Sequence, residues 1–230
     1  MKKKKIRENK NPDADRYIIV HAKEGDHIRA KRTDPFINAQ FAEMATETCS
    51  AAAKQILLKL KPFTERMTGR MNVRLSGKMR SAKKMTGFYN YSLLNGFELQ
   101  KDYPLDALYK GNYSVKNDNG KLELAVPIDD GYVQQHNGIV TAYYFEAVLV
   151  TGDAMVHNNL RVEDDRSDLF SFNQKYNTTV LFQFILPDNT PYLLFLKAGC
   201  MEGNEMAYHS KHYGMRVVGV GLVEVAVNGW

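Results

Sequence analysis

The second half of the chain, from Tyr91 onward, is a succession of short runs rich in β-branched and aromatic residues. Examples are KLELAVPI, IVTAYYFEAVLV, TTVLFQFILP and PYLLFLKAG, which are separated by Asn, Asp, Gly and Pro. Such runs predict strands, and Asn119-Gly120 is typical of a two-residue hairpin. Seven or more strands with no helical period between them indicate an antiparallel β-sandwich, immunoglobulin-like or jelly-roll-like.

The segment before this β-rich region has helical periodicity. Apolar residues recur at spacings of three and four between Ile37 and Leu60, which predicts one long helix. Pro35 fits the first turn of that helix, and Pro62 is expected to end or kink it. A second, shorter amphipathic helix is predicted within residues 70–85.

The N-terminal part is basic and contains little to bury. Residues 1–15 are expected to form a disordered tail, and RYIIVHAKEGDHIRAKR, which follows, has the pattern of a β-hairpin. The fold class is therefore predicted to be α+β, with three parts along the chain. These parts are a basic tail and β-hairpin at 1–33, a helical region at 34–88 and a β-sandwich domain at 89–230.

The two halves of the chain carry opposite charge, although the net charge of the whole is only +5. Residues 1–90 contain 21 Lys and Arg against 9 Asp and Glu, a net charge of +12. Residues 91–230 contain 10 against 17, a net charge of −7. The asymmetry favours a basic part that meets an acidic partner, such as nucleic acid, a membrane surface or another copy of the chain. Two solvated surfaces of opposite sign would account for it equally well.

The stretch RMNVRLSGKMRSAKKM, residues 70–85, has six cations and no acid. The apolar face of this predicted helix is mostly Met, which suits contact with protein better than with a membrane. Because the stretch has no aromatic residue, it is suited at most to contacts with a phosphate backbone. The alternative is a helix docked on the β-rich half with its cations in water. The residues predicted to bind an acidic partner or polyanion are Lys2, Lys3, Lys4, Lys5, Arg29, Lys31, Arg32, Arg70, Arg74, Lys78, Arg80, Lys83 and Lys84.

Two segments have residue types that could bind a metal ion. In EGNEMAYHSKH, a helix would place Glu205, His209 and His212 on one face, whereas a strand would separate the two histidines. The flanking composition favours strand and turn, so these three are weak candidates and no metal is expected. The acidic run RVEDDRSD, residues 161–168, lacks the alternation and the glycine of a calcium loop, and it is expected to be a solvated loop.

Motifs of catalysis and nucleotide binding do not occur in the sequence. GVG at 219–221 lies within a β-run and lacks the third glycine and the helix of a dinucleotide site. There is no phosphate-binding loop, no Gly-x-Ser-x-Gly elbow and no marked pair of carboxylates. Cys49 and Cys200 have no metal or redox spacing and are expected to be reduced core residues. We therefore expect a protein without enzymatic activity and without a cofactor.

Targeting signals and membrane spans are likewise not predicted. The basic start MKKKKIRENKN is not followed by the apolar run of a secretory signal, and no window approaches 18 consecutive apolar residues. The expected location is the cytoplasm, or a particle or assembly that is exported without a signal peptide.

The order of the motifs resembles that of an uncharacterised bacterial protein family. The matching segments are RTDPFINAQFAE, LLKLKPFTERMTGRMNVRLSGKMR and LLNGFELQKDYPLDALYKGNYSV. The resemblance extends over nearly the whole chain. It implies a basic N-terminal hairpin, a helical middle and a β-rich C-terminal half, and it implies no activity.

Three functions are consistent with these patterns. The favoured one is a structural or interaction protein that forms a homo-oligomer or part of a larger assembly, such as a phage-like or surface structure. The first alternative is sequence-independent nucleic-acid binding by the basic tail and residues 70–84. The second is a carbohydrate or ligand site on the β-rich half. Its tyrosines would be Tyr132, Tyr143, Tyr144, Tyr192, Tyr208 and Tyr213.

Overall fold

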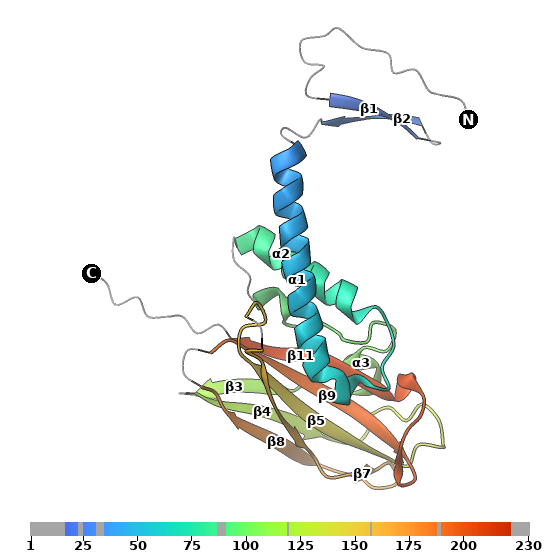
Figure 1. Cartoon of the computed structure of the whole chain (residues 1–230). Helices are drawn as coiled ribbons and strands as arrows, with labels where there is room; N and C mark the ends of the chain where they lie inside the picture. Colours follow the sequence, from blue (N-terminus) through green and yellow to red (C-terminus); the bar gives the residue numbers. More distant parts are fainter. Residues whose placement is uncertain are drawn as a thin grey trace. The chain divides into compact units, whose positions relative to one another are not determined.

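A computed structural model describes most of the chain from Tyr17 to Gly221 (Figure 1). The described residues are 17–22, 25–30, 35–86, 91–118, 120–156, 158–187 and 190–221, and side chains are described for 47–82 and from 91 onward within these ranges. The chain divides into a smaller unit, Met1–Ala45, and a larger one, Thr46–Trp230. The three-part division predicted from the sequence stays a prediction.

The smaller unit contains a two-stranded antiparallel hairpin and the beginning of a helix. β1 (Tyr17–Ala22) pairs with β2 (Gly25–Ala30) in an unbroken register, from Tyr17 opposite Ala30 to Ala22 opposite Gly25. The hairpin lies where the segment RYIIVHAKEGDHIRAKR predicts it. The tail predicted to be disordered lies outside the described residues.

Two helices follow, at the positions where the sequence predicts them. α1 (Pro35–Thr64) begins at a proline, where the missing N–H costs no helical hydrogen bond. Pro62 lies in the last turn, so the helix ends two residues after it rather than kinking in its middle. Gly69 has φ of +119°, a value that favours glycine, and the chain turns there into α2 (Met71–Thr86).

Where side chains are described, both helices bury apolar residues in the larger unit. On α1 these include two adjacent alanines, Ala52 and Ala53. The periodicity of α2 predicted that Leu75, Met79 and Ala82 share one face, and all three are buried. The buried residues of α1 are Cys49, Ala52, Ala53, Ile56 and Leu60.

The larger sheet is built on two long central strands, and every pairing in it is antiparallel. β5 (Ala142–Thr151) pairs with β9 (Tyr192–Glu202) from Ala142 opposite Met201 to Thr151 opposite Tyr192. All of β9 except its last residue and all of β5 except its first are buried, so both faces of this pair are covered. The flanking strands are β11 (Tyr213–Gly221) and β10 (Glu205–Met206) beside β9, and β6 (Arg161–Arg166) and β7 (Phe170–Ser171) beside β5.

The smaller sheet has three antiparallel strands in the order β3 (Ser114–Asp118), β4 (Lys121–Ile128), β8 (Thr178–Ile185). Burial alternates along β4, which places one face of this sheet in the core and the other at the surface. Gly120, with φ of +82°, lies in the β3–β4 turn, as the Asn-Gly signal predicts. Pro127 lies beyond the end of the β3–β4 ladder, so its missing N–H leaves no bond of that ladder unmade.

A single hydrophobic cluster contains residues from both helices and both sheets. Tyr109, which follows the short helix α3 (Leu105–Leu108), links the two sheets directly. Its ring packs edge-on against Phe145 with centroids 4.9 Å apart, and its hydroxyl donates to the carbonyl oxygen of Pro127 at 2.7 Å. The architecture is therefore α+β, with a β-rich C-terminal half of antiparallel sheets, as the composition of that half predicts. None of the helices in the described ranges is long and apolar enough to cross a membrane.

The segment around Glu98, after the short 3-10 helix η1 (Ser92–Leu94), joins α2 to β11. Backbone hydrogen bonds connect it to β11, including Leu99 N–H to the oxygen of Met215 at 2.8 Å. The Glu98 carboxylate accepts from Nε of Arg216, whose guanidinium also donates to Asp106. From the other side, the guanidinium of Arg74 on α2 donates to the carbonyl oxygens of Glu98 and Leu99.

A buried ion pair crosses the two central strands. Lys197 Nζ on β9 lies 2.7 Å from Oε2 of Glu146, its direct cross-strand partner on β5, and both side chains are buried. The ring of Tyr144 lies nearby, with its centroid 3.7 Å from the guanidinium carbon of Arg166 and 5.7 Å from Nζ of Lys197. Moving either charge out of water alone would cost several kcal/mol. The pair is tolerated because the two charges neutralise each other.

Replacing one partner of this pair is expected to destabilise the protein strongly. Lys197→Met leaves the Glu146 carboxylate buried without a partner, and we expect a loss of about 3–5 kcal/mol in the free energy of unfolding. The double variant Lys197→Met with Glu146→Leu should recover most of that loss, since no charge is then left buried. Urea unfolding, monitored by circular dichroism, measures the free energy of unfolding of the single and the double variant. Equal destabilisation of the single and double variants would contradict this account.

Candidate interaction surface

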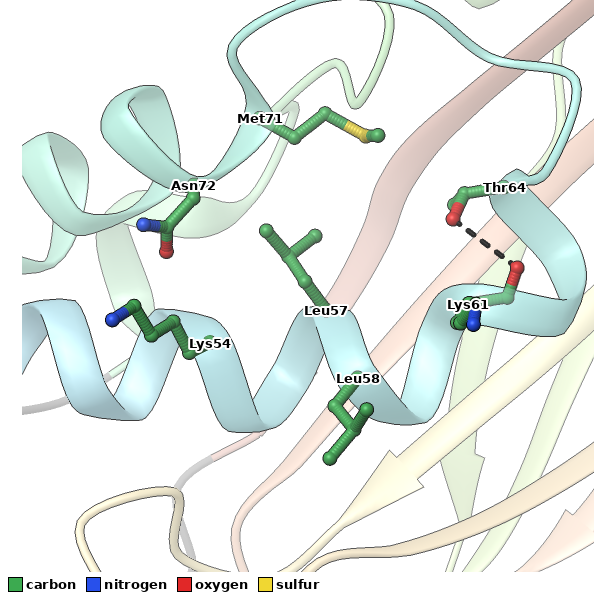
Figure 2. A pocket seen from close by; sticks show the side chains of 7 residues that line it. All are labelled: Lys54, Leu57, Leu58, Lys61, Thr64, Met71 and Asn72. Carbon is green, nitrogen blue, oxygen red and sulfur yellow. Dashed lines mark hydrogen bonds between the residues drawn. The ribbon is translucent and has the colours of Figure 1, made fainter.

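An apolar hollow lies between the last turns of α1 and the first turn of α2. Its volume is about 360 Å³. Figure 2 shows Leu57 on α1 pointing toward Met71 across the gap between the helices. The hydroxyl of Thr64 donates to the carbonyl oxygen of Leu60 at 3.1 Å, so its polar group is satisfied within α1. The residues that line the hollow are Lys54, Leu57, Leu58, Lys61, Thr64, Met71 and Asn72.

A large apolar side chain is exposed at this hollow. The side chain of Leu58, which lines the hollow, is 70% exposed. An isolated exposed apolar residue is ordinary, but one that lines an apolar hollow indicates a contact surface. We call the hollow, with Leu58 and its two lysines, the α1–α2 surface.

The part of the sequence that contains the α1–α2 surface is strongly basic. Between Thr48 and Phe97 the sequence contains ten Lys and Arg and a single acid, Glu65. Lys54 and Lys61 line the hollow itself, and both are exposed. An apolar floor within a positive rim is complementary to an apolar group that carries acidic neighbours.

The structure brings only some of the predicted basic residues to this surface. Arg70, which is exposed, directly precedes Met71 of the hollow, and Lys78 lies seven residues after Met71 on the same face of α2. Arg80 is also exposed on α2. Arg74 instead has its donors engaged by Glu98 and Leu99, and its guanidinium lies 5.0 Å from the centroid of the Phe97 ring.

The remaining predicted basic residues have no described side chains. Arg29 is on β2, and Lys83 and Lys84 are on α2, each with only the backbone described. Lys2, Lys3, Lys4, Lys5, Lys31 and Arg32 lie outside the described residues. Their predicted role in binding an acidic partner stays a prediction.

Sequence reasoning missed the lysines that line the hollow. Lys54 and Lys61 belong to a helix that was recognised by its apolar stripe, and their charges were counted only in the total of the N-terminal half. Leu58 is the signal in the sequence that could have pointed to them. It lies off the stripe of Ile56 and Leu60, so a helix with one buried face must expose it. An exposed leucine among lysines indicates a contact surface, and Leu58 does line the hollow with Lys54 and Lys61.

The metal candidates lie on a strand, a turn and a short 3-10 helix, as the composition of 202–212 favours. Glu205 is exposed on β10, His209 is exposed before η2 (Ser210–His212), and His212 is buried. Nδ1 of His209 accepts from the backbone N–H of Lys211 at 3.1 Å. Across the described part of the chain, no group of three or more His, Cys, Asp or Glu side chains is arranged to hold a metal ion.

His212 nevertheless differs from His136 and His209, the other histidines whose side chains are described, in being fully buried. Its side chain is 1% exposed, and neither ring nitrogen has a hydrogen-bond partner. The ring centroids of His136 and His209 lie 6.1 Å and 6.3 Å from that of His212. Burial first, then the positive charge of Lys211, lowers the pKa of His212, so the folded protein holds this imidazole neutral.

The acidic run expected to be a loop is in fact an edge strand. Residues 161–166 form β6, which pairs with β5 along its whole length. Val162, opposite Val150, is half-buried and packs against the core. The sequence prediction considered only the charges of this run and overlooked this apolar residue. The acids Glu163, Asp164 and Asp165 are exposed. Partial burial first, then the negative charge of Glu146, raises the pKa of Asp164.

Four of the six tyrosines considered for a ligand site are buried in the core: Tyr143, Tyr144, Tyr192 and Tyr213. Tyr132 is half-buried and Tyr208 is exposed. Both cysteines are free and buried, as predicted. Burial raises the pKa of the Cys200 thiol to about 12, which suppresses the reactive thiolate.

Comparison with models of known protein families, with curated proteins and with solved structures finds no match to this chain. The resemblance to an uncharacterised bacterial family therefore stays a prediction. The assignment of a function depends on the geometry and charge of the described residues.

The depressed pKa of His212 predicts a stability that falls with acidification. The unfolded chain takes up a proton near pH 6.5, whereas the folded imidazole resists it, so stability is complete above about pH 6.5 and declines as the pH falls below that value. We expect His212→Leu to show a smaller loss of melting temperature between pH 7.5 and pH 5.5 than the wild type. Ile139→Ser, at an exposed position without a titratable side chain, is the control. An unchanged pH dependence in His212→Leu would contradict the assignment.

Proposed function

We propose that this protein is a non-enzymatic structural or interaction protein that binds an acidic partner through its α1–α2 surface. The observation that carries the proposal is the hollow with an apolar floor of Leu57, Leu58 and Met71 and a rim that includes Lys54 and Lys61. The partner is either a different acidic protein or another copy of the chain, whose residues 91–230 carry a net charge of −7.

The chemistry of the surface favours an amphipathic acidic segment. One apolar side chain of such a segment would fill the hollow and cover Leu58, and carboxylates beside it would pair with the two lysines of the rim. An amphipathic helix that lays its apolar face into a hydrophobic groove is a common mode of recognition. Because the rim lysines are exposed, salt should screen their attraction to the partner's carboxylates. The apolar contribution should persist, so salt should weaken binding only in part.

As part of this proposal, the β-rich half is an antiparallel sandwich that serves as the rigid support of the helices. Three observations favour this arrangement. Both faces of β5 and β9 are buried, β4 alternates in burial, and the Tyr109 ring packs on Phe145 of the larger sheet while its hydroxyl bonds Pro127 of the smaller one. The immunoglobulin-like or jelly-roll-like form of the sandwich belongs to the proposal as well.

Nucleic-acid binding is the second candidate, because Arg70, Lys78 and Arg80 are exposed on or beside α2. Binding of a phosphate backbone requires positive charge but no apolar contact. Binding of a protein partner at the α1–α2 surface requires positive charge and apolar contact. The two candidates therefore differ in their response to removal of Leu58.

Two probes separate these candidates. The first is a fluorescein-labelled helical peptide of about 15 residues with Leu on one face and Glu on the other. The second is a single-stranded oligonucleotide of similar net charge. Fluorescence anisotropy at low and moderate salt measures the binding of each probe to the purified full-length chain.

We expect the peptide to bind and Leu58→Ser to weaken its binding at least about tenfold, since burial of a leucine contributes about 1.5–3 kcal/mol. Lys54→Glu combined with Lys61→Glu should weaken it by a similar factor. The matched controls are Ile139→Ser and Lys101→Glu, exposed residues outside both helices, and they should have no effect. Peptide binding that is insensitive to Leu58→Ser, or binding of the oligonucleotide alone, would overturn the proposal.

A further inference from the structure

The strand β8 forms an open edge of the smaller sheet. Its register with β4 runs without a bulge from Thr178 opposite Ile128 to Ile185 opposite Lys121. Along the described chain, no strand pairs with its other side. The sequence of β8, TTVLFQFI, contains no charged residue and no proline. Natural proteins usually protect a long edge strand with lysine, proline, a bulge or a covering segment, and β8 has none of the first three.

The backbone of β8 directs unpaired groups outward at alternate residues. Just after β8, the N–H of Leu186 donates to the carbonyl oxygen of Gly120 at 2.7 Å, so Leu186 directs its hydrogen-bonding groups toward β4. In an antiparallel ladder this direction alternates along the strand. The even-numbered residues of β8 therefore bond to β4. The odd-numbered residues Thr179, Leu181, Gln183 and Ile185 present their N–H and C=O groups at the open edge.

The side chains of the same odd-numbered residues lie on the surface. Phe182 and Phe184 point into the core, whereas Leu181 is 53% exposed and Ile185 is 71% exposed. The carboxamide of Gln183 donates to Glu123 Oε2 on β4 at 3.0 Å, which holds this side chain along its own sheet. The open edge therefore combines free backbone groups with two exposed apolar side chains.

Space is available beside the first part of β8. A hollow of about 390 Å³ separates Thr178–Phe182 from the segment that joins β6 to β7. Asp165, Arg166, Ser167, Asp168 and Phe170 line its other side. The segment from Asp165 to Phe170 thus leaves room beside the edge for a strand end.

Charge distinguishes this edge from the other open edge next to it. Consider β6 paired antiparallel with β6 of a second copy, with the two-fold axis at Asp164. Asp164 would then lie opposite Asp164 of the other copy, and Glu163 would lie opposite Asp165. Like charges directly opposite each other destabilise a strand pair. β8 is neutral, so self-pairing of β8 meets no such repulsion.

We propose that β8 pairs antiparallel with β8 of a second copy about a two-fold axis at Gln183. In this register Gln183 lies opposite its own equivalent, and Leu181 of one copy lies opposite Ile185 of the other. Each of these pairs exchanges both backbone hydrogen bonds, because all three residues direct their N–H and C=O groups outward. Only this register places the two exposed apolar residues opposite each other.

The pairing joins two copies of the smaller sheet into one continuous sheet. The strand edge is about 27 Å long, at roughly 3.4 Å for each residue. Such an edge alone buries less area than the ~1,200 Å² typical of stable complexes. The dimer is therefore concentration-dependent. Its surface is separate from the α1–α2 surface, so the inference does not depend on the proposed function.

Single cysteine substitutions test the register directly. In a hydrogen-bonded antiparallel pair the Cα atoms of opposite residues are about 5.5 Å apart, within the range of a disulfide. Gln183→Cys should therefore form a disulfide-linked dimer under mild oxidation. Leu181→Cys, on the same strand, should not, because its equivalent lies four residues away, at about 14 Å. The wild type is the control, since Cys49 and Cys200 are buried. Non-reducing electrophoresis reads the result.

Sedimentation velocity of the full-length chain over a range of concentrations measures the uncrosslinked dimer. We expect the wild type to show a monomer–dimer equilibrium and Leu181→Lys to raise its dissociation constant at least about tenfold, since it places a charge on the open edge. Ile139→Lys, at an exposed site outside the strands, should leave the equilibrium unchanged. A wild type that is monomeric at every concentration, or Leu181→Cys linking as readily as Gln183→Cys, would overturn the proposal.

Discussion

The burial of both faces of the β5–β9 strand pair is the constraint on which the rest of the structure depends. A strand with two buried faces needs a layer of apolar side chains on each side. The stripe of α1, the alternating side chains of β4 and the ring of Tyr109 all contribute to the single hydrophobic cluster around this pair. Within the pair, Glu146 and Lys197 are the buried charged residues, and they are tolerated because they neutralise each other.

The surfaces left after this burial differ in chemistry. The α1–α2 surface is apolar with a positive rim, β6 is an acidic edge, and β8 is a neutral edge with exposed apolar side chains. Part of the positive charge of the first half thus lies on the α1–α2 surface, and part of the negative charge of the second half lies on β6. The acids of β6 protect that edge from pairing, and the same protection is missing from β8.

The sequence predicted the elements better than the site. The hairpin, both helices and the β-rich half follow from local periodicity, and the buried face of α2 follows from the spacing of Leu75, Met79 and Ala82. The acidic run was wrongly predicted to be a loop, because its pairing with β5 is a long-range contact that charge counting cannot detect. Arg74 was grouped with the cations predicted to bind a partner for a similar reason: the carbonyl groups that it binds, at Glu98 and Leu99, lie far along the chain.

The segment around Glu98 has a consequence for the order in which the protein is made. It is held in place by β11, the last described strand, through Arg216 and the backbone of Met215. During synthesis α1, α2 and the residues up to Tyr109 emerge long before that strand exists. Until Tyr213–Gly221 leaves the ribosome, the segment to which Arg74 of α2 donates lacks its hydrogen bonds to β11. Late, long-range closure of this kind slows folding and leaves the partly folded nascent chain prone to aggregation in the meantime.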